Sequence, residues 1–154
     1  MLAQMDDALR AVLSRPHFQR VLRGHEDWVG ALAWHPDGST LASASTDGTV
    51  HLWNLRSVEV APRVLRGHEG AVWALAWHSD GSPLPSAGGD RTIRLWDLQS
   101  PEAAHRMLPG HEDWVFALAW HPDGSTLASA GNDFTGRLWI ARTVDLATMI
   151  GTIS

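Results

Sequence analysis

The residues best equipped for chemistry in this sequence are its nine histidines, together with the serines and aspartates that recur near them. Imidazoles ligate zinc, and a serine, a histidine and an aspartate together carry out nucleophilic hydrolysis. His25, His68 and His111 each follow a glycine and lie 43 residues apart. Groups that recur once per repeat are held apart by the repeat, so these imidazoles are not expected to converge on one ion at about 2.0–2.1 Å. We expect no metal, no cofactor and no catalytic residue.

Composition narrows the classes of partner. The formal net charge of -5 at pH 7 argues against nucleic acid, because phosphate backbones are held by dense Lys and Arg. The absence of cysteine excludes a disulfide framework, a thiolate nucleophile and Cys-ligated zinc. The sequence contains no run of about 18 apolar residues, so it predicts no membrane span. Asp6 and Asp7 lie where a secretory signal would have its apolar run, which argues against such a signal. We expect a cytoplasmic protein.

A repeat of 43 residues organises most of the chain. Trp53, Trp96 and Trp139 keep the same interval as the Gly-His pairs. Residues 24–55 are identical to residues 110–141 at 24 of 32 positions. Self-similarity at such a period indicates a repeat architecture, here of three homologous units.

Each unit has the pattern of short strands separated by turns. In the first unit, Pro36-Asp37-Gly38 and Asp47-Gly48 are turn sequences. The segments that flank them are rich in apolar, β-branched and aromatic residues, which favour strands. The four predicted strands of this unit are residues 28–34, 40–45, 49–55 and 63–66.

Two units depart from this pattern. In the second unit, Pro83 and Pro85 fall in a predicted central strand, where proline gives up a hydrogen bond of the ladder. We therefore expect a local distortion in that unit. In the third unit, Phe134 and Gly136 replace Gly48 and Val50, which weakens the third predicted strand.

With its Gly-His opening, its aspartate turn and its closing Trp-Asp dipeptide, the repeat resembles the WD-repeat family. The literal dipeptide occurs at Trp96-Asp97, while the other units read Trp53-Asn54 and Trp139-Ile140. The resemblance covers roughly residues 18–141 and implies an all-β fold of four-stranded antiparallel blades around a central channel. The expected organisation is an N-terminal helical or disordered segment (1–17), three repeats within 18–142 (about 18–55, 63–98 and 106–141) and a C-terminal tail (143–154).

The resemblance also implies one buried hydrogen-bonded set per blade, made of the Gly-His histidine, a serine, the turn aspartate and the closing tryptophan. The sets are His25, Ser43, Asp47 and Trp53; His68, Ser86, Asp90 and Trp96; and His111, Ser129, Asp133 and Trp139. Polar groups buried in a blade need such partners, because each group left without one costs roughly 1–3 kcal/mol. Serine, histidine and aspartate also resemble a hydrolase triad, but three similar copies are what folding needs and what catalysis does not. A His-dependent hydrolase remains the remote alternative.

Other recurrent side chains divide into packing residues and candidate contact residues. The tryptophans that end the first predicted strands are predicted core: Trp34, Trp77 and Trp120. The histidines that follow them are predicted to lie on the surface: His35, His78 and His121. Two further positions of the repeat, which we call the variable columns, differ in residue type from unit to unit. They lie near the end of the blade where the family's partner-binding face would be. Their aromatic members are candidates for binding a partner, with packing between blades as the open alternative: Trp28, Trp73, Trp114 and Phe116.

The ends of the array pose a closure problem, because three blades cannot form a ring and propellers use typically four to eight. Residues 18–23 match the fourth-strand segments and so form an outer strand without a blade of its own. We therefore expect a homodimer of six blades in which these N-terminal strands are exchanged and complete the last blades. In the alternative, residues 149–152 complete the last blade without exchange. An amphipathic helix, or a frayed terminus, is predicted from the spacing of Leu2, Met5, Leu9 and Leu13.

These observations favour a non-catalytic protein-protein interaction scaffold, a half-propeller that self-assembles into a closed propeller. The step from propeller to scaffold rests on fold analogy. Its expected partners are a second copy of the chain and an unknown protein or peptide, with no nucleic acid and no membrane. The alternative is a fragment, natural or engineered, of a longer seven- or eight-bladed signalling or sensor protein.

Overall fold

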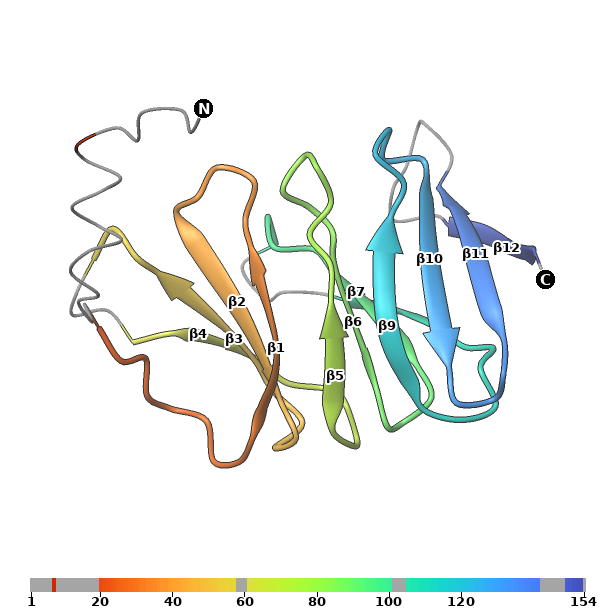
Figure 1. Ribbon diagram of the computed structural model, residues 1–154, viewed down its shortest axis with the longest axis horizontal. Coiled ribbons are helices and arrows are strands. Elements are labelled where there is room, and N and C mark those ends of the chain that lie inside the picture. Colours follow the sequence, from red (N-terminus) through yellow and green to blue (C-terminus); the bar gives the residue numbers. More distant parts are fainter. Residues whose placement is uncertain (1–6, 8–19, 58–60, 101–104, 142–148, 154) are drawn as a thin grey trace, which may run out of the picture.

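Three antiparallel sheets of four strands each make up the described part of the chain (Figure 1). The computed structural model describes residues 7, 20–57, 61–100, 105–141 and 149–153. The amphipathic helix predicted from Leu2 to Leu13 lies outside these residues except for Asp7. Within the described ranges, no helix is long and apolar enough to cross a membrane.

We name the sheets blades 1, 2 and 3 in chain order. Blade 1 contains β1 (Val29–Trp34), β2 (Thr40–Ser45), β3 (Val50–Asn54) and β4 (Arg63–Leu65). Blade 2 contains β5 (Val72–Leu75), β6 (Leu84–Gly88), β7 (Ile93–Trp96) and β8 (His105–Leu108). Blade 3 contains β9 (Val115–Trp120), β10 (Thr126–Gly131), β11 (Gly136–Ala141) and β12 (Met149–Ile153). The predicted all-β fold of four-stranded blades is confirmed, and the four strands predicted in the first repeat agree to within one residue at each end.

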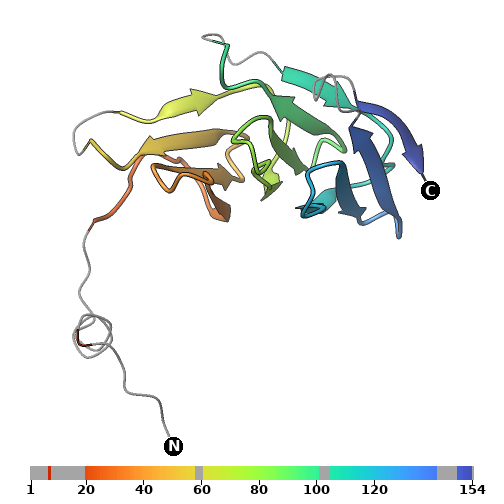
Figure 2. The ribbon, with the colours of Figure 1, turned by 90° about the horizontal axis from the view of Figure 1, so that it is seen from above.

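The blades stand side by side along an open arc, which is clearest from above (Figure 2). The second and third strands of every blade pair in the same register, with a leucine opposite the closing tryptophan: Leu41 and Trp53, Leu84 and Trp96, Leu127 and Trp139. Buried apolar side chains form two clusters, one shared by blades 1 and 2 and the other by blades 2 and 3. The apolar core therefore lies at the boundaries between blades, which we call seams.

The first strand of each blade contains a β-bulge at one of the variable columns. The register shifts between Val29 and Ala31 in β1, and equivalent shifts occur in β5 and β9. The residues at these shifts are Gly30, Trp73 and Phe116. A bulge places an extra residue in one strand and re-aims its side chain. The bulge therefore sets the direction of the two aromatic members of this column.

The last blade is completed by the tail of the same chain. β12 pairs antiparallel with β11, placing Ile153 opposite Leu138 and Thr152 opposite Trp139. Of the two alternatives for the fourth strand, the structure shows the one in which residues 149–153 fill the place. The outer strand expected at residues 18–23 is absent from its described part, because residues 20–23 belong to no strand. An outer strand needs a free edge, and β4, β8 and β12 already occupy the outer edges of the three blades.

The two prolines shorten the inner part of blade 2. β5 ends at Leu75, whereas the equivalent strands β1 and β9 continue through Trp34 and Trp120. The Pro85 carbonyl accepts a hydrogen bond from the Ala76 N–H at 3.2 Å, but proline has no N–H to return. The distortion expected from the sequence is therefore present as a shorter strand pair.

Candidate functional site

Each blade contains one of the polar sets expected from the sequence, and the structure brings all four members of each set together. In blade 1, His25 Nδ1 lies 3.0 Å from Asp47 Oδ2, and His25 Nε2 lies 2.7 Å from Ser43 Oγ. The Trp53 indole donates to the same Ser43 Oγ at 2.8 Å. We call this arrangement the polar cluster of the blade.

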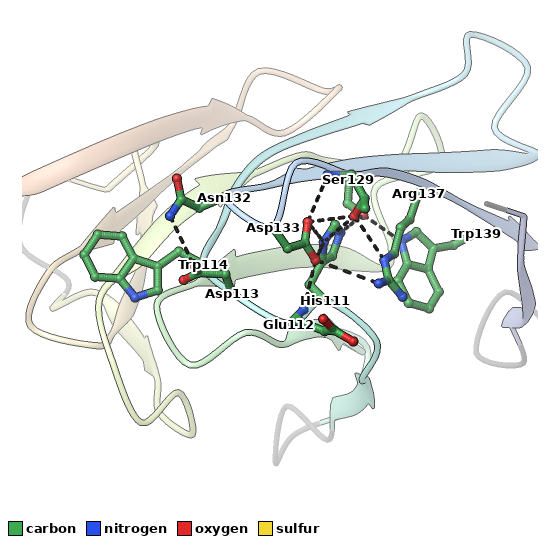
Figure 3. Close-up of polar contacts among 10 residues, drawn as sticks. His111, Glu112, Asp113, Trp114, Ser129, Asn132, Asp133, Arg137 and Trp139 are labelled. Carbon is green, nitrogen blue, oxygen red and sulfur yellow. Dashed lines mark hydrogen bonds and ion pairs between the residues drawn. The ribbon is translucent and has the colours of Figure 1, made fainter.

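The clusters of the other two blades repeat these distances closely. In blade 2 the three contacts, among His68, Ser86, Asp90 and Trp96, measure 3.0, 2.6 and 2.8 Å. In blade 3 they measure 3.0, 2.7 and 2.9 Å, among His111, Ser129, Asp133 and Trp139 (Figure 3). The cluster joins the Gly-His loop, the second strand, the following turn and the third strand, so it can hold four segments of one blade in register.

The aspartates are the most heavily bonded members of the clusters. Asp47 accepts from the Glu26 N–H at 3.0 Å and from the Thr49 N–H and Oγ1 at 2.8 and 2.6 Å. Burial raises the pKa of Asp47, but the hydrogen bonds from Thr49, Glu26 and His25 together hold it well below its usual range. Asp90 has a lowered pKa for the same opposing reasons. In blade 3, the hydrogen bond from the Thr135 hydroxyl is the main reason why the pKa of Asp133 is low.

The serines of the clusters are poorly placed to act as nucleophiles. An ionised aspartate accepts the Nδ1–H of histidine, so a neutral imidazole presents Nε2 to the serine O–H, and the serine oxygen accepts from the indole. The histidine ring nitrogens, the serine hydroxyl and the indole N–H of each cluster are therefore all engaged inside the blade. The serines are also buried, at 3%, 0% and 4% exposed for Ser43, Ser86 and Ser129. A substrate carbonyl could not approach them without opening the blade.

Blade 1 differs from the others in the third-strand residue beside the cluster. His51 stacks on His25, with ring centroids 3.7 Å apart and an interplanar angle of 24°. Its Nδ1 is buried and makes no hydrogen bond within the described residues. The equivalent residues Arg94 and Arg137 instead pair with the cluster aspartates, at 3.5 and 3.8 Å. His51 was not among the residues predicted from the sequence to form a site, although the equivalent residues of the other blades are both arginine.

The candidate partner-binding aromatics fall into two groups. Trp28, Trp114 and Phe116 are 78%, 54% and 53% exposed. Trp73 is half-buried, and its ring lies so close to Gly30 of blade 1 that an added Cβ there would be 3.3 Å from it. The structure thus places Trp73 in a seam and the other three at the surface.

The seams are closed by contacts that were not predicted from the sequence. The Trp77 indole donates to the Ala33 carbonyl of the preceding blade at 3.0 Å, and the Trp120 indole donates to the Ala76 carbonyl at 3.0 Å. In the opposite direction, His78 Nε2 donates to the Gly124 carbonyl of the next blade at 3.0 Å. His78 also meets the Trp120 ring edge-on at 4.7 Å. We call this pair of reciprocal contacts the seam contact.

Two expectations about these columns are wrong at particular positions. His78 was expected on the surface, but it is only 3% exposed because blade 3 covers it. Trp34 was expected in the core, but it is 58% exposed because no blade precedes blade 1 in the described chain. Residues with the same local sequence therefore differ in burial according to whether another blade lies beside them.

A pocket of about 400 Å³ opens at the seam between blades 1 and 2, lined by residues that include His35, Asn54, Arg63 and Trp77. Arg63 crosses the seam and donates to the carbonyls of Leu98 and Ser100 at 3.1 and 2.7 Å. The pocket is thus bounded by groups that join the blades.

Comparisons with known proteins agree with this architecture. The family described as WD domain, G-beta repeat matches residues 16–54, 60–97 and 103–139. Protein HIRA of Zea mays is 54% identical over 35 residues, which are 23% of this chain and 4% of that protein. Lissencephaly-1 homolog 1 of Paramecium tetraurelia is 46% identical over 35 residues, again 23% of this chain and 9% of that protein.

Solved structures match over a larger part of the chain. The structure of U3-55K and the RRP9 WD40 repeats each superpose with a TM-score of 0.75 at 29% identity, covering 87% of this chain. The chain spans 41% of the length of each of those structures and a small fraction of the curated relatives. Three registered repeats, four-stranded blades and family matches over most of the sequence show that this chain belongs to the WD-repeat family of β-propeller proteins.

Proposed function

We propose that this chain is a non-catalytic protein-protein interaction scaffold that contributes three blades to a closed propeller. The observation that carries this proposal is the difference between equivalent positions inside the array and at its ends. Leu52 of blade 1 is 8% exposed because blade 2 covers it, whereas the equivalent Leu138 of blade 3 is 43% exposed. On the opposite end, Leu32 of blade 1 is 62% exposed. Uncovered apolar faces of this kind are typical of surfaces that bind another protein.

A second copy of the chain is the proposed source of the missing blades. Two copies supply six blades, a number within the range that closed propellers use. Because β12 occupies the outer edge of blade 3, this closure needs no exchange of N-terminal strands. We propose that the copies associate through their end faces instead.

Trp28 and Trp114 form the proposed surface for a protein or peptide partner. Both lie in the loop after the Gly-His pair, and the preceding aspartates accept their backbone N–H groups at 2.8 Å. The Trp114 carbonyl accepts the Asn132 N–H at 2.7 Å (Figure 3 shows this loop). Exposed indoles on a backbone that is held by hydrogen bonds bind partners at low entropic cost, which suits a contact surface. Phe116 extends this surface. The cytoplasmic location and the absence of a nucleic-acid partner stay predictions.

The second candidate function is that of a segment in a longer WD-repeat protein, which would supply the covering blades within one chain. The 41% coverage of the two solved structures favours this candidate. The two candidates differ in whether the 154-residue chain assembles by itself.

Light scattering during gel filtration, over a hundredfold range of protein concentration, tests self-assembly. We expect a particle whose mass is a multiple of 16.8 kDa, with a dimer as the expected species. A folded monomer at every concentration would contradict self-assembly and favour the longer protein.

The partner surface is tested by selecting peptides that bind the wild-type protein and measuring their affinity for a Trp28→Ala, Trp114→Ala double variant. We expect weaker binding with unchanged particle mass. Peptides that bind both proteins equally would place the partner surface elsewhere.

A further inference from the structure

The seam contact is built from two halves that come from different blades. One half is the tryptophan that ends the first strand, which donates to an alanine carbonyl of the preceding blade. The other half is the histidine after that tryptophan, whose ring packs against the tryptophan and the turn glycine of the following blade. Every blade carries both halves, so each end blade keeps one half without a partner among the residues that the structure describes.

The unused halves lie on the two exposed ends of the array. In blade 1, Trp34 is 58% exposed, and its indole N–H has no acceptor in the part of the chain that the structure describes. In blade 3, the His121 side chain is 59% exposed, against 4% for His78 at the equivalent position in blade 2. Across the described residues, no indole reaches the Ala119 carbonyl, whose equivalents Ala33 and Ala76 each accept one.

The turn glycines show the space that a histidine would occupy. Gly81 and Gly124 lie directly against the rings of His35 and His78, and an added Cβ at Gly124 would be 2.7 Å from His78 Nε2. Gly38 of blade 1 has the same left-handed backbone, with φ of 75°, but no atom of the described residues lies within 4 Å of its added Cβ position. Beside Gly38, no described residue fills the place that corresponds to those of His35 and His78 in the internal seams.

We propose that blade 1 of one copy docks on blade 3 of a second copy by forming a third seam contact. Trp34 donates its indole N–H to Ala119 of the partner subunit, and His121 of the partner subunit packs beside Gly38. The inference deepens the proposed function, on which it rests, by naming the surfaces that meet. The occupant is a second copy because the two end faces carry the two halves of a contact whose indole hydrogen bond and histidine packing occur at both internal seams.

The apolar residues around these halves also correspond to a pair that meets at an internal seam. Inside the chain, Leu52 and Leu75 belong to one apolar cluster across the seam between blades 1 and 2. Their equivalents at the ends are Leu138 on blade 3 and Leu32 on blade 1, both exposed. The proposed contact brings Leu138 of one copy to Leu32 of the other. Because two different faces meet, the association is head-to-tail, and a ring closes when every copy uses both faces.

Site-specific cross-linking tests the geometry directly, because the natural chain has no cysteine. Leu32→Cys and Leu138→Cys variants are prepared separately and treated with a short bismaleimide, alone and as an equimolar mixture. We expect dimeric products in the mixture and almost none from either variant alone. Asp97→Cys, at an exposed site after β7, serves as the control and should not link to Leu138→Cys.

The outcomes separate this inference from the proposed function. A dimer in which either single variant links efficiently to itself would keep self-assembly and overturn the head-to-tail contact. A chain that is monomeric by light scattering would remove self-assembly and the contact together. Links from the Asp97→Cys control equal to those from Leu32→Cys would show random collisions and would also overturn the inference.

A second set of variants tests the polar half of the contact. Trp34→Phe keeps an aromatic ring but removes the indole donor at both seams of the closed dimer, so we expect self-association to weaken roughly tenfold or more. His121→Ala should weaken it as well. Met107→Ala removes a comparably exposed apolar side chain from β8 and should leave the association constant unchanged. Unchanged association in both Trp34→Phe and His121→Ala would overturn the proposed contact.

Discussion

The polar cluster of blade 1 and those of blades 2 and 3 share one skeleton but differ in the residue beside it. The histidine-aspartate distance is 3.0 Å in every blade. Beside the aspartate stands His51 in blade 1, Arg94 in blade 2 and Arg137 in blade 3. The blade fold therefore fixes four positions of the cluster and leaves the fifth free to set its electrostatics.

The fifth position gives the blades different responses to charge. Arg94 and Arg137 bring a permanent positive charge to their aspartates. The pKa of His51 is lowered chiefly by its burial, against the attraction of Asp47. Blade 1 therefore favours a neutral side chain where the other blades hold a cation.

The largest effect is expected on acidification, because all three clusters change together. The pKa values of Asp47, Asp90 and Asp133 are lowered in the folded state. Their contribution is fully present above the unfolded value of about 3.9 and is lost as the pH falls below it. His51 also has a lowered pKa, so protonation below about pH 6.5 disfavours the folded state. Urea unfolding between pH 7.5 and 3 should show a modest loss of free energy first and a steep loss below pH 4. A constant free energy over this range would contradict both assignments.

Removing one cluster aspartate should have the next largest effect. Asp90→Ala removes the hydrogen-bond acceptor of His68 and Thr92 and the ion-pair partner of Arg94, and we expect it to lower the free energy of unfolding by roughly 1–3 kcal/mol. Asp47→Ala should lower the free energy of unfolding somewhat less than Asp90→Ala, because no arginine loses its partner in blade 1. Asp133→Ala should act in the same direction.

Asp97→Ala is the matched control, since this exposed side chain accepts one hydrogen bond from the Gln99 N–H. Its denaturant midpoint should stay close to that of the wild type. If the three cluster variants also keep their midpoints, the clusters do not stabilise the blades.

Replacing His51 by arginine should remove the difference between the blades at small cost. Gly24 lies against His51 as Gly110 lies against Arg137, so the longer side chain has an equivalent place. The new ion pair with the largely buried Asp47 gains attraction but also costs desolvation of the guanidinium, so stability at pH 7.5 should change little. The modest loss between pH 6.5 and 5 should become smaller than in the wild type. If that loss persists, other groups cause it, among which His105 also has a pKa lowered by burial and by Arg94.

The sequence predicts the inside of a blade well because those contacts lie within one repeat. Turn sequences such as Asp47-Gly48 and the interval from Gly-His to tryptophan specify strands and register locally. The seam contact was missed because His78 and Gly124 come from different repeats. The residues next to a histidine at the end of a strand do not indicate whether that histidine is buried. The fourth strand of blade 3 could not be decided, because residues 18–23 and 149–152 both have a suitable pattern. What distinguishes them is which segment reaches the edge of β11, a property of the folded chain.

The smallest expected effect is that of a chelator on the wild-type protein. His25, Asp47 and His51 offer ligand atoms that lie within 4.8 Å of one another in blade 1. An imidazole lone pair lies in the plane of its ring, so two nearly parallel rings 3.7 Å apart direct their lone pairs side by side and not toward one ion. His25 Nδ1 is moreover engaged with Asp47. We expect EDTA, and zinc added after it, to change neither the melting temperature nor the particle mass. The His51→Arg variant is the control: a shift with EDTA in the wild type that is absent in this variant would locate a metal ion in blade 1 and contradict the prediction.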